Sequence, residues 1–170
     1  MSLEQENMNN AELKLKDEAL KKAEFFMNKA LQQAQKAYKK GEVPVGSVIV
    51  ADGKVVSRGY NERELKNSAL KHAEITAIER ACKKRKSWRL DECDLYVTLE
   101  PCPMCAGAII QARIRNVFFG THDPKAGAAG SVTDLFKKGL FNHDVTVYGN
   151  VMEKECSQIL KHFFSSLRKN

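Results

Sequence analysis

The sequence predicts an α/β fold in which a mixed five-stranded sheet lies between helices on both faces. Two observations predict it: β-rich runs alternate with helical patterns in the second half of the chain, and a long amphipathic helix and a hairpin precede them. Strands that alternate with helices pair in parallel, whereas hairpin strands pair antiparallel, so the sheet should be mixed. At 170 residues and 43% hydrophobic content, the chain can bury one core.

Residues 1–17 are polar and nearly free of large apolar side chains, so we expect a flexible N-terminal extension. Residues 18–170 are then expected to form one domain, since the chain has no internal repeat and no low-complexity linker. Over residues 18–40 the apolar side chains recur at helical spacing, and Gly41 follows where a helix C-cap belongs.

Two short β-rich runs at residues 45–50 and 54–60 are joined by Asp52-Gly53, which is typical of a tight two-residue hairpin turn. The remaining elements are expected as a helix at 72–82, a strand at 95–99, a helix at 103–111, a strand at 116–119, a short helix after the loop at 125–131, a strand at 145–148 and a last helix at 152–167. In that last helix, Phe163 lies on the apolar stripe and should be buried, whereas Phe164 should be exposed.

The net charge of +7 is compatible with a polyanionic partner, and residues 80–89 hold much of the basic charge. A charge run is more often a solvated face than a binding site, so the charge alone decides little. No apolar run approaches the roughly 18 residues that a membrane span needs, so we expect no membrane segment.

The five cysteines form an odd set, and two of them are separated by only two residues. No segment has the pattern of a secretory signal peptide. Metal or thiol chemistry in a reducing compartment therefore fits better than a disulfide framework, and we expect the protein in the cytoplasm.

The segment Pro101-Cys102-Pro103-Met104-Cys105 predicts a metal site at the start of a helix. Pro103 is suited to the first helical position, which makes Cys102 the N-cap and Cys105 the third helical residue. The positive end of the helix lowers the pKa of a thiol, and thiolates are the form that zinc binds. By chance such a Pro-Cys-x-x-Cys should occur on the order of once in several hundred similar chains.

A Cys-x-x-Cys pair is also compatible with a redox dithiol, or with half of a structural zinc site, although the chain has no second pair. It has instead His72-Ala73-Glu74 at the predicted start of another helix. His72, Cys102 and Cys105 would supply three ligands and leave a fourth position for water, as in catalytic zinc sites. In a first helical turn, Glu74 can lie beside the metal that His72 binds and transfer protons.

These two motifs together resemble the H-x-E…P-C-x-x-C signature of the zinc-dependent nucleoside and nucleobase deaminases. Residues 42–46, Asn61 and residues 123–131 are similar to the corresponding segments of the tRNA-specific adenosine deaminases. The likeness extends over residues 18–167.

This resemblance implies a three-layer α/β/α cytidine deaminase-like fold, one Zn²⁺ per subunit and a homodimer. It also implies conversion of adenosine to inosine at the wobble position of a tRNA anticodon stem-loop, with the ACG anticodon of tRNA-Arg as the expected substrate. Asn61 would hydrogen-bond the inserted base, Val45 would form the pocket wall, and Pro101 and Asp123 would lie beside the substrate.

Other interpretations stay open on sequence alone. The same signature serves guanine deaminases, free cytosine deaminases and a deaminase domain of riboflavin biosynthesis. A non-catalytic RNA-binding module is a further alternative, in which Cys82 or His122 closes the zinc as a fourth ligand, although such a site has no use for Glu74. Residues 127–130 (Gly-Ala-Ala-Gly) could form a phosphate cradle or a tight packing loop. The terminal residues 163–169 contain only two cations, so tail contacts to RNA should be modest.

Overall fold

The computed structural model describes the backbone of residues 3–168 and the side chains of residues 14–168. Residues 1–2 of the expected extension and residues 169–170 of the expected domain lie outside the described residues. The elements are, in chain order, α1 (Leu3–Lys39), β1 (Gly46–Ala51), β2 (Lys54–Tyr60), α2 (Ala73–Arg85), β3 (Asp94–Leu99), α3 (Pro103–Gln111), β4 (Asn116–Thr121), β5 (Thr146–Tyr148) and α4 (Glu153–Leu167).

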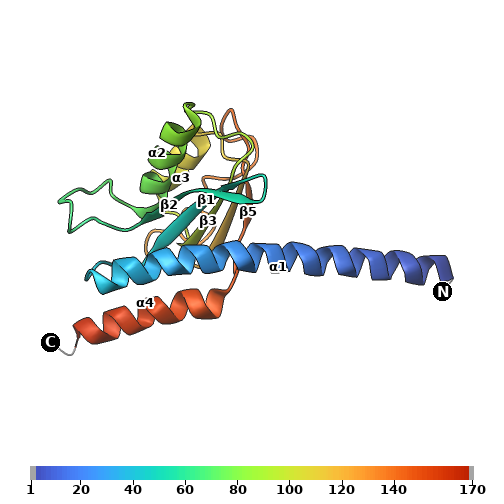
Figure 1. Cartoon of the computed structure of the whole chain (residues 1–170), viewed down its shortest axis with the longest axis horizontal. Helices are drawn as coiled ribbons and strands as arrows, with labels where there is room; N and C mark the ends of the chain where they lie inside the picture. Colours follow the sequence, from blue (N-terminus) through green and yellow to red (C-terminus); the bar gives the residue numbers. More distant parts are fainter. Residues whose placement is uncertain (1–2, 169–170) are drawn as a thin grey trace.

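The five strands form one mixed sheet in the order β2-β1-β3-β4-β5. Strand β1 pairs antiparallel with both β2 and β3, whereas β3, β4 and β5 pair in parallel. Helices α1 and α4 cover one face of the sheet, and α2 and α3 cover the other (Figure 1). The predicted three-layer α/β/α arrangement around a mixed five-stranded sheet is therefore confirmed.

The predicted hairpin turn is present between β1 and β2. Asp52 and Gly53 have φ values of 50° and 69°, and Ala51 pairs with Lys54 across the turn. Both turn residues are thus left-handed, as the two-residue turn that matches the twist of a sheet requires.

Two glycines in this hairpin allow helices to pack closely on both faces of the sheet. A Cβ on Gly46 would collide with the carbonyl oxygen of Ala30 in α1, and one on Gly59 would collide with that of Ala73 in α2. Only a residue without a side chain permits this approach. The close packing of α2 on β2 places the first turn of α2 at the edge of the sheet.

Two elements differ from the sequence prediction by more than a few residues. Helix α1 begins at Leu3 rather than near residue 18, because adding residues to an existing helix needs no new nucleus even where the side chains are polar. The flexibility of residues 1–17 stays a prediction. Residues 131–145 form turns instead of the expected short helix. Here the carboxylates of Asp134 and Asp144 accept the backbone N–H groups of Phe136 and Gly139, which favours turns over a helix.

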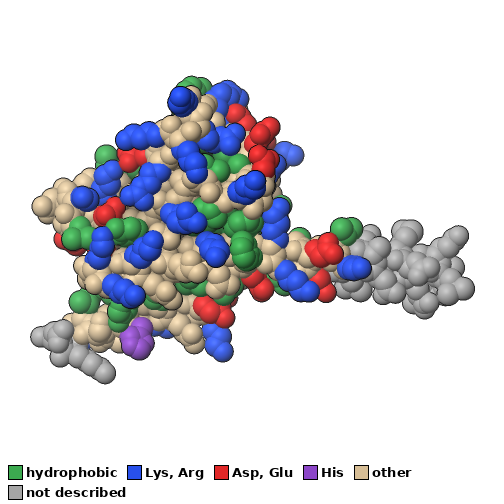
Figure 2. Space-filling model, in the orientation of Figure 1, with side chains coloured by type: hydrophobic (Ala, Val, Ile, Leu, Met, Phe, Trp, Pro, Cys, Tyr) green, Lys and Arg blue, Asp and Glu red, His purple; other side chains and the backbone are tan. Residues whose placement is uncertain are grey.

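Basic side chains outnumber acidic ones, with 28 Lys and Arg against 21 Asp and Glu. On the face drawn in Figure 2, Lys and Arg side chains are spread over the body of the domain, and acidic side chains are fewer. The basic residues at 80–89 are all exposed, which agrees with a solvated face. None of the described helices combines the length and hydrophobicity that crossing a membrane would require.

Candidate metal centre and active-site pocket

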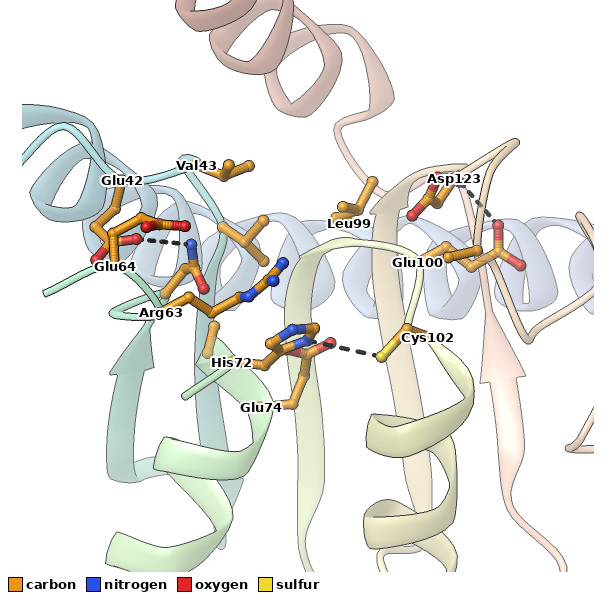
Figure 3. Close-up of a pocket in the computed structure, with 14 residues that line it drawn as sticks. Glu42, Val43, Arg63, Glu64, His72, Glu74, Leu99, Glu100, Cys102 and Asp123 are labelled. Atoms are coloured by element: carbon orange, nitrogen blue, oxygen red, sulfur yellow. Dashed lines mark hydrogen bonds between the residues drawn. The ribbon is translucent and has the colours of Figure 1, made fainter. Parts of the chain in front are cut away.

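The starts of helices α2 and α3 face each other. Cys102 is the N-cap of α3, as predicted, and Pro103 occupies the first turn of α3; His72 is the N-cap of α2, which begins at Ala73. Both cap residues have extended backbones, and neither side chain makes an N-cap hydrogen bond. The two side chains are therefore free to point toward the same space (Figure 3).

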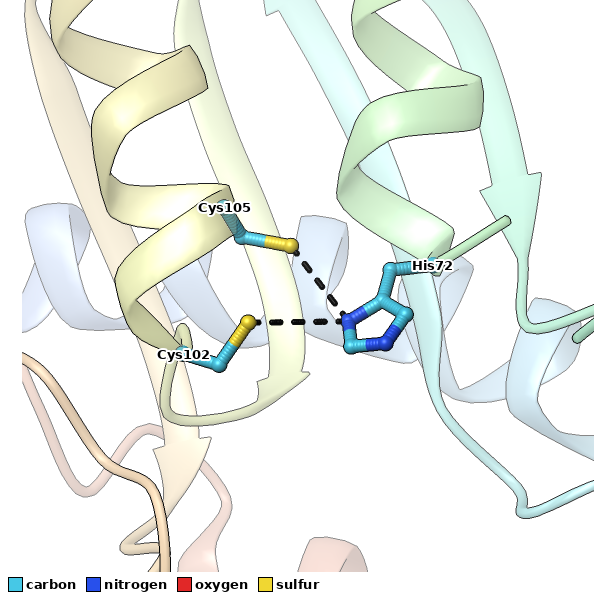
Figure 4. Close-up of side chains that lie close together, drawn as sticks. All are labelled: His72, Cys102 and Cys105. Atoms are coloured by element: carbon cyan, nitrogen blue, oxygen red, sulfur yellow. Dashed lines mark hydrogen bonds between the residues drawn. The ribbon is translucent and has the colours of Figure 1, made fainter. Parts of the chain in front are cut away.

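Three side chains converge there with distances that suit zinc. The Nδ1 atom of His72 lies 3.6 Å from Sγ of Cys102 and 3.5 Å from Sγ of Cys105 (Figure 4). In a tetrahedral site with Zn–S of about 2.3 Å and Zn–N of about 2.05 Å, the nitrogen and sulfur ligands are about 3.6 Å apart. The three residues are thus spaced as zinc ligands already.

No fourth protein ligand joins this cluster among the described residues. The Cys82 thiol instead donates to the carbonyl oxygen of Trp88, and His122 contacts Glu100 and Ser131. The alternative in which Cys82 or His122 closes a purely structural zinc site is therefore not supported.

The ionisable groups at this centre influence one another strongly. Hydrogen bonds with Cys105 and His72 lower the pKa of the Cys102 thiol to about 4, and the contact with Cys102 raises the pKa of the Cys105 thiol. The pKa of His72 is raised by its hydrogen bond to Cys102. Burial raises the pKa of Glu74 to about 7. A cation here would favour the deprotonated forms of all these groups.

A cavity of about 240 Å³ opens onto the metal centre. His72, Glu74 and Cys102 all line it, so that Glu74 lies beside two of the three candidate metal ligands. Of the residues expected around the substrate, Val45, Asn61 and Asp123 also belong to the lining. Val45 directly precedes β1, Asn61 directly follows β2, and Asp123 lies in the loop after β4.

Pro101 is the one predicted substrate residue that does not line this cavity. It is buried, and its carbonyl oxygen accepts a hydrogen bond of 2.8 Å from the backbone N–H of Ala128. Its position joins the start of α3 to the loop that carries Asp123.

Glu100 is a buried carboxylate that the sequence analysis did not single out. It accepts hydrogen bonds from the backbone N–H groups of Asp123 (3.0 Å), Ala129 (2.8 Å) and Ser131 (3.1 Å), and from the hydroxyl of Ser131. Burial alone would raise the pKa of Glu100, but these hydrogen bonds outweigh it and lower the pKa.

The loop at residues 127–130 is consequently a packing loop and not a phosphate cradle. The backbone N–H groups of Ala129 and of the next residue after the loop, Ser131, already bind the Glu100 carboxylate, and a Cβ on Gly127 would collide with that carboxylate. For Glu100, the only signal in the sequence was its place directly before the Pro-Cys motif. Its hydrogen-bond partners lie 23 to 31 residues further along the chain, so no local pattern identified them.

Glu42 is a second buried carboxylate, which the sequence analysis included in the segment 42–46 but did not single out. It lines the same cavity and accepts hydrogen bonds from the Asn61 side-chain amide and from the backbone N–H of Leu65. Its sequence signal was its place in the segment 42–46.

The C-terminal helix agrees with the prediction for its aromatic pair. Phe163 is 6% exposed and packs in the core, whereas Phe164 is 46% exposed. The tail was predicted to make only modest contacts to RNA through its two cations. One of these, Lys169, lies outside the described residues.

Comparison with known proteins places this pocket inside a deaminase domain. The MafB19-like deaminase family matches residues 21–168, which include every residue of the cavity. The chain is 46% identical over 146 residues to the tRNA-specific adenosine deaminase of Bacillus subtilis (strain 168), covering 86% of this chain and 91% of the relative. It is 44% identical over 143 residues to that of Agrobacterium fabrum (strain C58 / ATCC 33970), covering 84% and 94%.

Solved structures agree with these relatives. A chain from a study of A-to-I editing by tRNA:A34 deaminases at the wobble position of transfer RNA superposes with a TM-score of 0.77 at 44% identity. The match covers 80% of this chain and 99% of the other. The guanine deaminase from Nitrosomonas europaea gives a TM-score of 0.74 at 20% identity over 84% of each chain, which is a likeness of fold alone.

Proposed function

The chain belongs to the tRNA-specific adenosine deaminase family, and on that basis we propose that it hydrolyses adenosine to inosine at the wobble position of a tRNA. The observation that carries the proposal is a cavity in which a buried glutamate, Glu74, lies beside a His-Cys-Cys set spaced for zinc. Such a set without a fourth protein ligand among the described residues suits hydrolysis better than structural support.

One Zn²⁺ per subunit would be held by His72, Cys102 and Cys105. When bound, a zinc ion with such ligands acidifies water enough for a nucleophile to form near neutral pH. Glu74 accepts the proton of the attacking water and delivers it to the ring nitrogen N1 while the water oxygen adds to C6. Glu74 then takes the proton of the new C6 hydroxyl and passes it to the amine, so that the C–N bond breaks, ammonia departs and inosine remains.

The substrate residues fit the entry of a single base. Asn61 would hydrogen-bond the base and Val45 would pack against it. Asp123 would lie at the mouth of the cavity, and Pro101 would contribute there through the loop that it anchors. A base must leave its stack to enter such a cavity, and an unpaired anticodon loop is where this costs least. We therefore propose a tRNA anticodon stem-loop as the partner, with the ACG anticodon of tRNA-Arg as the preferred one.

We also propose that the enzyme works as a homodimer in the cytoplasm, as the family resemblance implies. Light scattering of the zinc-loaded protein should give the mass of two chains. A monomer at concentrations that support full activity would remove dimerisation from the proposal.

The direct test is a comparison of substrates at equal concentration. A short RNA hairpin with the wobble adenosine of an ACG anticodon should be converted to inosine, and total tRNA should gain inosine on incubation. Free guanine, cytosine and adenosine should react far more slowly, because remote contacts to flanking nucleotides contribute to transition-state binding. Faster turnover of any free base or nucleoside would overturn the tRNA assignment and leave a deaminase of small molecules.

A further inference from the structure

Glu42 lies in the wall of the proposed base pocket with its carboxylate turned inward. The residue follows the end of α1, and only 1% of it is exposed. One carboxylate oxygen accepts a hydrogen bond of 3.2 Å from Nδ2 of Asn61, drawn as a dashed line at Glu42 in Figure 3. The other accepts a bond of 2.7 Å from the backbone N–H of Leu65.

This contact determines which way the Asn61 amide faces. An ionised carboxylate has no proton to donate, so it can bind the NH₂ group of an amide but not its oxygen. The backbone N–H of Asn61 is held separately by the carbonyl oxygen of Val45 at 3.0 Å. Within the described residues, Glu42 is the only side chain that hydrogen-bonds the Asn61 amide.

We infer that Glu42 is a positioning residue that fixes the Asn61 amide in one orientation. The NH₂ donor and the oxygen acceptor of this amide then face a base in the pocket in one fixed arrangement. The inference rests on the proposed role of Asn61 in binding the base. A base edge that matches this arrangement is bound, and one with donor and acceptor exchanged leaves buried polar groups unpaired. Glu42 thereby contributes to base specificity without touching the base.

Protein stability tests the contact without any substrate. Asn61→Asp places a second carboxylate against Glu42, which should lower the melting temperature. Adding Glu42→Gln supplies an amide donor to the new carboxylate, so the double variant should recover most of that loss. Glu62→Gln is the matched control, since Glu62 is 8% exposed and does not line the cavity, and it should give no recovery in the Asn61→Asp background. A double variant no more stable than Asn61→Asp would overturn the inference.

Turnover of the ACG hairpin tests the consequence for the base. Glu42→Gln should lower kcat/KM by on the order of tenfold to a hundredfold, with zinc content unchanged. In an Asn61→Ala background, the same substitution should cost no more than about twofold. Equal losses in both backgrounds would show that Glu42 acts independently of Asn61 and would overturn the inference. If stability is rescued as expected but the wild type leaves the hairpin intact, the Glu42–Asn61 contact stands and the tRNA assignment fails.

Discussion

The Nδ1 atom of His72 lies 3.6 Å from Sγ of Cys102, although 30 positions separate the two residues in the chain. Both are helix N-caps, and their helices α2 and α3 lie on the same face of the sheet, over one cluster of buried residues that includes Ala77 and Ala106. The candidate metal centre is therefore formed by two helix starts that pack on the same sheet. The positive ends of both helices favour the thiolate ligands there.

Replacing Glu74 by glutamine should abolish most turnover while the protein keeps its fold and its zinc. General acid–base transfer typically contributes about 10²-fold to 10⁴-fold, and Glu74 also activates the nucleophile, so the loss should reach at least that range. Single-turnover rates on the hairpin, with metal analysis of the same sample, measure it. Glu79→Gln, on an exposed part of α2, is the control. A near-normal rate for Glu74→Gln would exclude this residue from proton transfer.

Cys102→Ala and Cys105→Ala should each lose zinc and lower the stability of the protein. Metal binding stabilises the folded state that presents its ligands, so removing one ligand removes part of that free energy. Atomic absorption and thermal unfolding with and without added zinc give the two quantities. Cys82→Ala, outside the cluster, should keep one zinc per chain. If either ligand variant also kept one zinc per chain, another ligand must replace the lost thiolate.

Glu100→Gln should destabilise the protein at neutral pH and change its response to acid. The lowered pKa of Glu100 means that the ionised carboxylate contributes stability above its ordinary value of 4.5 and loses it as the pH falls through the folded-state pKa. At pH 7 we expect Glu100→Gln to lower the free energy of unfolding by about 1–3 kcal/mol, because hydrogen-bond donors lose their matched acceptor. This difference between the two proteins should shrink as the pH falls below 4.5. Unfolding midpoints of both proteins over this pH range provide the measurement. A difference that stays constant with pH would contradict the assignment of this effect to the carboxylate.

Binding of the hairpin should weaken as salt rises. The chain carries a net charge of +7, and each phosphate neutralised by Lys or Arg releases counterions, so the logarithm of the binding constant should fall linearly with the logarithm of salt concentration. Fluorescence anisotropy with the Glu74→Gln variant separates binding from turnover. A binding constant that does not change with salt would show that backbone phosphates contribute little.

Local signals in the sequence determined much of this protein. Pro103 after Cys102, Asp52-Gly53 between two β-rich runs and the periodicity of the helices each depend on neighbours within a few residues, and the structure confirms the elements that they predict. The alternation of strands and helices was likewise enough to predict the mixed sheet with helices on both faces. The local pairs His72/Glu74 and Cys102/Cys105 identified the residues of the candidate centre because each pair lies in one helical turn.

Only the tertiary structure decided how the walls of the pocket are held. Glu42 binds the Asn61 amide 19 positions away, and Glu100 binds Ser131 31 positions away, so neither pairing has a local pattern. The start of α1 at Leu3 and the turns at residues 131–145 also escaped prediction. Glu42 and Glu100 each had several possible partners along the chain, and the packing of α1, the sheet and the loops determined which donor reached each buried acceptor.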